Sequence, residues 1–162
     1  MALGYFHNMY RGMPVVKKNG VLIITHPLYD DFDPLHHPSY IEFFHRILPE
    51  TRDSAELQRK YEEEFAHNAD YIRMYRNGNA YHGVHPFYMW YWGENGRAHM
   101  GKVIVVGAES AQAARTMGWD VARNMEEALA LAQAHVGHKP SITMMHFAPI
   151  LMADVKANHG AV

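Results

Sequence analysis

Two polar residues near the start of the sequence have the types and spacing needed to hold a carboxylate. Asn8 and Arg11 lie three positions apart, so a helix over residues 5–12 would present an amide and a guanidinium on one face. Arginine grips a carboxylate with two parallel N–H donors, and the amide donates to a neighbouring oxygen. The spacing predicts a site for a small carboxylate. The alternative is that Arg11 only pairs with an acidic residue at the surface, which stabilises a protein little.

Two histidines stand where apolar runs end. His26 follows the run at 21–25, and His146 ends the run at 141–146. If both runs are strands of an open parallel sheet, both imidazoles lie at the carboxyl ends of strands, where such sheets bind ligands. We therefore predict that His26 and His146 contact a substrate. The simpler interpretation, that each is a polar cap on its strand, stays open.

Other ionisable residues fall short of a metal site. His82 and His85 have the spacing of one helical turn, but a structural zinc site needs four ligands and no second pair matches. The acidic residues Asp30, Asp31 and Asp33 lack the glycine bend and distal glutamate of a calcium loop. We therefore predict no metal on this chain, and a solvent-exposed acidic loop after the first strand.

The elements that must position these residues alternate between apolar strands and helices. Continuous apolar runs predict buried strands of a parallel sheet at 21–25, 103–106 and 141–146. Helical patterns at 108–117 and 124–136 join the second run to the third as a right-handed crossover, with a further short strand at 119–121. The turn at 106–110 has one glycine rather than the three of a dinucleotide fingerprint, which favours a plain tight turn over a phosphate site.

About 75 residues between the first two strands follow a helical rhythm. Capping-box spacings begin helices at Ser39 and Asp53, and further helices are predicted at 68–76 and 87–98. The last of these has five aromatic rings in six residues, so some rings must lie in the core while others face a partner or pocket. We expect an exposed aromatic surface around Trp90. The predicted fold class is α/β, a small, mainly parallel sheet flanked by helices, with a long helical insertion between the first two strands.

Composition excludes several functions. The 162 residues include 15 Lys and Arg against 17 Asp and Glu, a formal net charge of −2, which lacks the basic footprint of a general nucleic-acid binder. The absence of cysteine excludes disulfides and thiolate metal sites. No apolar run approaches the ~20 residues of a membrane span, and no signal peptide opens the chain. We predict one cytoplasmic α/β domain over residues 1–162 without nucleic-acid or membrane partners.

Ordered blocks of sequence, from about residue 4 to residue 155, resemble the C-terminal domain of the nickel-dependent lactate racemase family. The blocks are Asn8–Gly12, Gly20–Pro27, His37–Tyr40, Met89–Gly93, Val103–Val106 and Glu126–Leu129. The resemblance implies the second of two α/β domains, with the active site in the cleft between them. It also implies that the N-terminal, cofactor-binding domain has no counterpart in this sequence.

In that family a pincer nucleotide carrying nickel takes a hydride from Cα of a 2-hydroxy acid and returns it to either face. The catalytic and cofactor-binding residues belong to the N-terminal domain. The resemblance therefore implies a substrate-contacting lid that is inactive alone, with no catalytic residue, cofactor or metal of its own. Asn8 and Arg11 stand where the family has Gln and Lys, which favours a 2-hydroxy acid other than lactate. A pocket-lining Trp of the family falls at Trp90, with Trp92 as a slip of register.

The predicted substrate-binding residues are thus Asn8, Arg11, Trp90, His26 and His146. The predicted partners are a small 2-hydroxy acid and the missing N-terminal domain, and the chain itself is a monomer or a weak homodimer. Two other functions stay open. One is a stand-alone α/β module that binds a small carboxylate without catalysis. The other is metal storage by the 13 histidines, which are scattered rather than grouped at ligand spacings.

Overall fold

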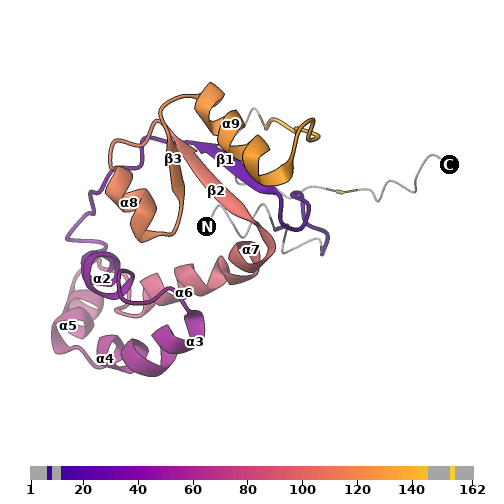
Figure 1. Cartoon of the computed structure of the whole chain (residues 1–162). Coiled ribbons are helices and arrows are strands. Elements are labelled where there is room, and N and C mark those ends of the chain that lie inside the picture. The colour runs from indigo at the N-terminus through magenta and orange to yellow at the C-terminus, as the bar shows by residue number, and fades with distance from the viewer. Residues whose placement is uncertain (1–6, 9–11, 146–153, 156–162) are drawn as a thin grey trace.

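A parallel sheet lies at the centre of the computed structural model, which describes residues 7–8, 12–145 and 154–155 (Figure 1). In this part of the chain the sheet has three strands in the order β1 (Val21–Thr25), β2 (Lys102–Val106) and β3 (Asp120–Ala122), all parallel. Lys102 on β2 pairs with Asp120 on β3. The α/β prediction is confirmed, as is the long helical insertion between β1 and β2.

Helix α9 (Met125–Val136) covers one face of the sheet. Asn124 caps this helix by accepting the N–H of Glu127 at 2.9 Å, as the capping-box spacing predicts, and Gly137 ends it with a φ of 88°. Ala128 and Ala132 pack on Ile104 of β2. These small side chains let the helix approach the sheet closely. On the other face lie Leu22, Met100, Val103 and Trp119.

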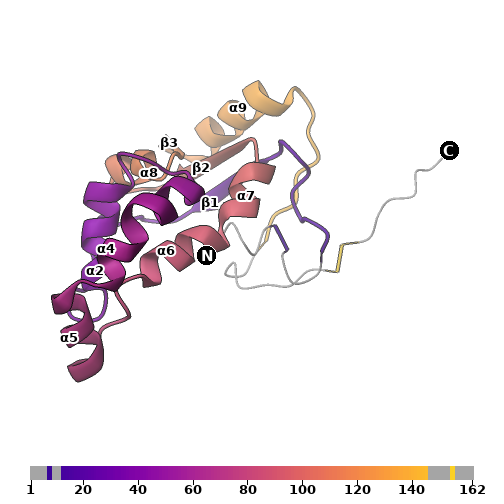
Figure 2. The same ribbon diagram turned by 90° about the horizontal axis from the view of Figure 1, so that it is seen from below.

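The insertion forms a second layer of helices beside the sheet (Figures 1 and 2). Its elements are α2 (Pro38–Glu42), the π-helical turn η1 (Phe43–Ile47), α3 (Ser54–Leu57), the π-helical turn η2 (Gln58–Glu62), α4 (Glu63–Ala66), α5 (Ala69–Asn77), α6 (His85–Trp92) and α7 (Glu94–His99). Helix α5 lies at the end of the insertion farthest from the sheet (Figure 2).

Aromatic packing holds the insertion together. The ring of Phe87 on α6 lies 4.7 Å from that of Phe43 and 4.9 Å from that of Phe65. Ala113, on α8 (Ala111–Thr116), belongs to the same buried cluster. The insertion therefore packs on α8, which joins β2 to β3, and the two layers share one core.

Three predictions about local structure are wrong. Residues 141–145 form no strand, and the third strand is β3. The helix predicted over residues 5–12 is absent at the described residues 7, 8 and 12. Asn8 and Gly12 have left-handed φ values of 56° and 75°, which an α-helix does not contain. Helix α2 begins with Pro38 at its first turn, which pre-sets the helical φ, so Ser39 does not cap it.

Candidate functional site

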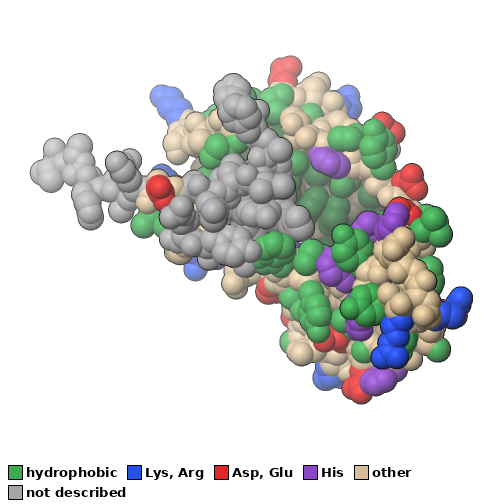
Figure 3. Space-filling view, turned by 180° about the vertical axis from the view of Figure 1, so that it is seen from behind, with side chains coloured by type: hydrophobic (Ala, Val, Ile, Leu, Met, Phe, Trp, Pro, Cys, Tyr) green, Lys and Arg blue, Asp and Glu red, His purple; other side chains and the backbone are tan. Residues whose placement is uncertain are grey.

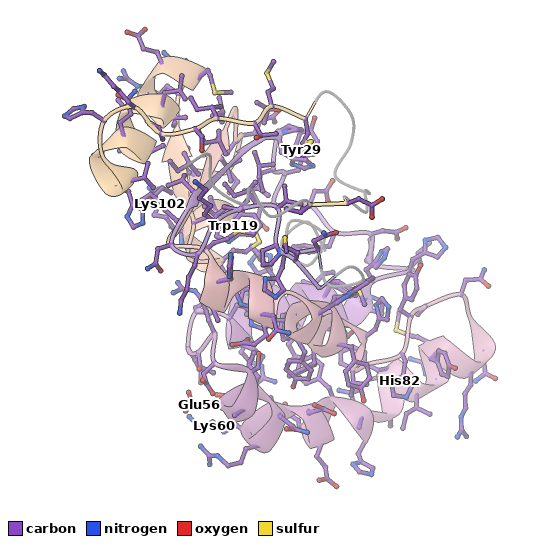
Figure 4. All side chains as sticks on the ribbon, turned by 90° about the vertical axis from the view of Figure 1, so that its right-hand side faces the viewer. Tyr29, Glu56, Lys60, His82, Lys102 and Trp119 are labelled. Carbon is purple, nitrogen blue, oxygen red and sulfur yellow. The ribbon has the colours of Figure 1, made fainter. Side chains whose placement is uncertain are left out.

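A cavity of about 270 Å³ lies between the insertion, α8 and the loop that follows β1. Aromatic and aliphatic side chains form nearly all of its wall, and Arg97 is the one charged residue among those described there. The lining residues are Leu28, Tyr29, Phe32, Tyr40, Phe43, Phe44, Leu48, Pro86, Met89, Trp90, Gly93, Arg97, Ala113, Met117 and Trp119. In Figure 4, Tyr29 and Trp119 lie on the sheet side of the molecule, and His82 lies away from both on the insertion.

Trp90 is fixed in the wall of this cavity. Only 9% of the residue is exposed, and its indole N–H donates to the carbonyl of Arg52 at 3.0 Å. The exposed aromatic surface expected around Trp90 does not include Trp90 itself, because α6 turns Trp90 and Phe87 into the core and leaves Tyr88 51% exposed. The sequence prediction that some of these rings face a pocket holds for Trp90.

Arg97 clamps Trp90 from α7. Its guanidinium carbon lies 4.0 Å from the centroid of the Trp90 ring, and Nη1 donates to the Trp90 carbonyl at 2.8 Å. Nη2 donates to the Glu94 carboxylate at 2.6 Å, and the Ser54 hydroxyl donates to the same carboxylate. Burial lowers the pKa of Arg97, and Glu94 opposes that shift. Because Glu94 neutralises it, Arg97 is not a spare cation for a ligand.

Sequence reasoning missed the Ser54–Glu94–Arg97 group. A signal was present, because Glu94 and Arg97 follow Trp90 by four and seven positions, which is the spacing of one helical face. The predicted single helix over 87–98 would have aligned them. In the structure Gly93 separates α6 from α7. The spacing still brings the side chains of Trp90, Glu94 and Arg97 together.

Histidine and tyrosine rings form a cluster beside the cavity. Tyr40 lines the cavity, and its hydroxyl is 2.6 Å from Nδ1 of His85. The ring of Tyr81 stacks between those of His85 and His37, at 4.5 and 4.9 Å. Burial raises the pKa of Tyr40 to about 12, with Tyr81 adding to it. Burial and the neighbouring His37 lower the pKa of His85. Figure 3 shows histidines among hydrophobic side chains over the insertion.

The predicted substrate residues do not converge on one point. His26 is exposed, and its Nδ1 accepts the N–H of Leu28 at 2.9 Å, as in the polar-cap interpretation. Asn8 is only 2% exposed and donates to the carbonyl of Met13 at 2.7 Å. His7, beside Asn8, packs its ring 5.1 Å from that of His99 near the start of β2. His7 and Asn8 therefore lie at the amino end of the strands, whereas His26 follows the carboxyl end of β1, about 16 Å away along its five residues. Arg11 and His146 lie outside the described residues.

The turn after β2 is not a phosphate cradle. Gly107 takes the left-handed φ of 83° that a tight turn needs. The N–H groups of Glu109 and Ser110 donate to the carbonyls of Pro27 and Leu28, at 2.6 and 3.3 Å. Because these donors hold the loop that follows β1, they are not available to a phosphate. The prediction of a plain turn is confirmed.

No metal site or membrane helix emerges where the chain is described. Residues 7–8, 12–145 and 154–155 contain no group of three or more His, Asp or Glu side chains placed to hold a metal ion. His82 and His85 have separate partners, since the His82 ring packs against Tyr75 and that of His85 against Tyr81.

None of the helices in the described residues is both long and apolar enough to cross a membrane.

Comparisons with protein-family models, with curated proteins and with solved structures found no match. The resemblance to the lactate racemase family therefore stays a hypothesis that rests on the sequence blocks.

Proposed function

We propose that this chain is the substrate-contacting C-terminal domain of a lactate-racemase-like isomerase that inverts a 2-hydroxy acid. It is inactive alone, because the hydride-accepting nickel-pincer nucleotide and the acid/base residues belong to a separate N-terminal domain. The role of this chain is to bind the substrate, orient its Cα–H bond and exclude water from it.

The position of Trp90 carries the proposal. Trp90 is the residue to which the resemblance assigns a substrate contact, and it lies in the wall of an apolar cavity beside α7. The segment that contains Asn8 reaches the same helix, because the rings of His7 and His99 are in contact. Two sequence blocks about 80 positions apart thus meet around one helix. The contact of His7 with His99 brings the Asn8 segment to the same helix as Arg97, which clamps Trp90.

The proposal assigns the substrate carboxylate to Arg11. A carboxylate that enters a poorly hydrated cavity needs a cation to replace its water. Arg97 is already paired with Glu94 at 2.6 Å, so the charge must come from another residue. Asn8 donates its amide to Met13 in this structure, so a contact with substrate would require that turn to rearrange.

The size and lining of the cavity favour a substrate larger than lactate. A cavity of roughly 150 Å³ lined by apolar side chains holds a benzene ring. The cavity beside Trp90 has about 270 Å³ and is lined by rings and by the thioethers of Met89 and Met117. The methyl group of lactate would leave most of this space empty. We therefore assign the site to a 2-hydroxy acid with an aromatic or large apolar side chain.

The residues described here do not fit the nickel centre, since no three His, Asp or Glu side chains converge in them. The proposal accordingly places the nickel and the nucleotide on the other domain. No step of the hydride transfer is assigned to a side chain of this chain.

Calorimetric titration of the purified chain tests the proposal. We expect saturable binding of 3-phenyllactate, binding of lactate at least 10-fold weaker, and no change in the optical rotation of either acid. Arg11→Met should weaken phenyllactate binding at least 10-fold. The matched control is Arg73→Met, because the Arg73 side chain is 68% exposed and paired with Asp70. Equal binding of phenyllactate by both variants would overturn the assignment of Arg11.

A second function, a carboxylate-binding module without catalysis, uses the same cavity. The neutralised Arg97 and the apolar wall favour neither function over the other. The 2-hydroxyl group distinguishes them: an isomerase domain must recognise it, whereas a plain carboxylate module binds 3-phenylpropionate as tightly as 3-phenyllactate. Equal affinities for the two acids would favour the module.

A further inference from the structure

Among the described residues, one edge of the sheet is open along β1. The carbonyl of Gly20 and the N–H of His26 bond to the β2 side, at 3.0 and 3.1 Å. The backbone groups of successive residues in a strand point to alternate sides, so those of Val21, Ile23 and Thr25 point to the opposite edge. Within the described residues no strand and no hydrogen bond covers that edge. An uncovered edge of this kind accepts another strand.

The topology directs the chain back to this edge. Helix α8, which shares the core of the insertion, and helix α9 lie on opposite sides of the sheet (Figure 1). The crossover through α8 steps from β2 outward to β3. A right-handed crossover through a helix on the other face must step in the opposite direction, from β3 back past β1. Helix α9 touches all three described strands, as that path requires.

The end of α9 is tied to the start of β1. Nε2 of His135, in the last turn of α9, lies 3.1 Å from the carbonyl oxygen of Asn19, two residues before β1. The chain therefore leaves α9 at the amino end of β1, which is where a parallel neighbour of β1 begins. Residues 137–140 reach up to about 13 Å, and a neighbouring strand is only about 4.8 Å away.

The segment that follows has the composition of a strand without the contacts of one. Residues 141–145 belong to no helix or strand and are exposed. Ile142 is 66%, Met144 70% and Met145 38% exposed, so the segment presents apolar side chains to water. β1 offers partners for them on both faces, because Ile23 on the α9 side and Ile24 on the other side are only partly buried.

In the structure residues 141–145 are unpaired; we propose that in solution they dock as a fourth, parallel strand on the open edge of β1. The occupant is the chain's own segment, because α9 delivers it to the correct end of β1 through a four-residue link. Docking pairs the backbone groups of Val21, Ile23 and Thr25 and covers Ile142 and Met144. It also closes the edge against pairing with another molecule. The proposal is independent of the function assigned to the cavity.

Amide hydrogen exchange, measured residue by residue on the full chain, tests the docking. In the double variant Ile142→Asp/Met144→Asp we expect the amides of Ile23 and Thr25 to exchange at least 10-fold faster than in the parent chain. The amides of Leu22 and Ile24, which bond to β2, should keep their rates and so report that the sheet is intact. Met125→Asp is the matched control, since Met125 is 43% exposed but lies at the start of α9.

Equal exchange of Ile23 and Thr25 in the parent and the double variant would overturn the proposal. Protection that grows with protein concentration would also overturn it, because a second copy would then supply the strand. The absence of cysteine allows a further check by cross-linking. Ile23→Cys is combined in turn with Ile142→Cys, Thr143→Cys or Met144→Cys, and the rate of disulfide formation is compared among the three double variants. We expect one of them to form its disulfide at least 10-fold faster than the variant with the cysteine at the adjacent residue. Equal rates at all three would indicate random collision and contradict docking.

Discussion

Replacing Arg97 with Met removes the cation that clamps Trp90 and keeps a flexible side chain of similar length. In the parent chain, only 17% of the Arg97 side chain is exposed, so its contacts are partly shielded from water. The substitution deletes the contact with the Trp90 ring at 4.0 Å and the bond to the Trp90 carbonyl at 2.8 Å. It also leaves the Glu94 carboxylate with the Ser54 hydroxyl but without its cation.

The expected loss of unfolding free energy follows from these contacts. A hydrogen bond that involves a charged group contributes about 1.5–3 kcal/mol, and a partly desolvated cation–π contact about 0.5–2 kcal/mol. Because the contacts share one guanidinium and Glu94 is 43% exposed, the terms do not simply add. We expect a loss of about 2–4 kcal/mol, which lowers the Tm of a domain of this size by roughly 10 °C.

Urea unfolding followed by circular dichroism measures this loss. The control is Arg123→Met, which breaks the pair of Arg123 with Glu127 where the Arg123 side chain is 86% exposed; no measurable change is expected. An Arg97→Met chain that unfolds at the same urea concentration as the parent would refute the clamp. The indole emission of Trp90 gives a second readout, since loosening of the clamp should shift it to longer wavelength.

Three further predictions concern other parts of the chain. Stability should fall as the pH drops below about 6.5, because folding lowers the pKa of His85 below its ordinary value of 6.5 and the unfolded chain therefore binds the proton first. In urea titrations at several pH values, His85→Asn should flatten this dependence. An equal decline in the parent chain and in His85→Asn would contradict the prediction. Gly107→Ala should cost about 1–2 kcal/mol, measured by thermal unfolding, because Ala must then hold a φ of 83°; an unchanged Tm would show that the turn relaxes. Asn124→Ala should cost about 1 kcal/mol through the lost cap of α9, and a loss in helical content restricted to the first turn, seen by NMR, would support the cause.

Elements that depend on local sequence were predictable. The apolar runs of β1 and β2 and the caps of α9 require only neighbouring residues, and each lies where the pattern indicates. Residues 141–145 also have an apolar pattern, through Ile142, Met144 and Met145, but form no strand in the structure. Whether an apolar segment pairs depends on the path of the whole chain and on its neighbours in the sheet, and periodicity contains neither.

The site was predictable only in part. The sequence indicated that aromatic rings of α6 face a pocket, and Trp90 lines the cavity. The clamp by Arg97 was missed, although the spacing of Trp90, Glu94 and Arg97 contained a signal for it that survives the break at Gly93 between α6 and α7. The sequence prediction also misplaced Asn8, whose left-handed φ of 56° and bond to Met13 form a turn rather than a helix face. Asparagine tolerates that conformation better than most residues, so its type alone suited either structure.

The central claim is that the cavity beside Trp90 binds the apolar part of a 2-hydroxy acid. Intermolecular nuclear Overhauser effects between 3-phenyllactate and the chain test it most directly, because they report protons within a few ångströms of each other. At saturating ligand, the phenyl protons should show effects to the methyl of Met117 and to the indole rings of Trp90 and Trp119, which line the cavity from both layers. Bound phenyllactate with effects only to residues outside the cavity, or none to Trp90 and Trp119, would contradict the claim.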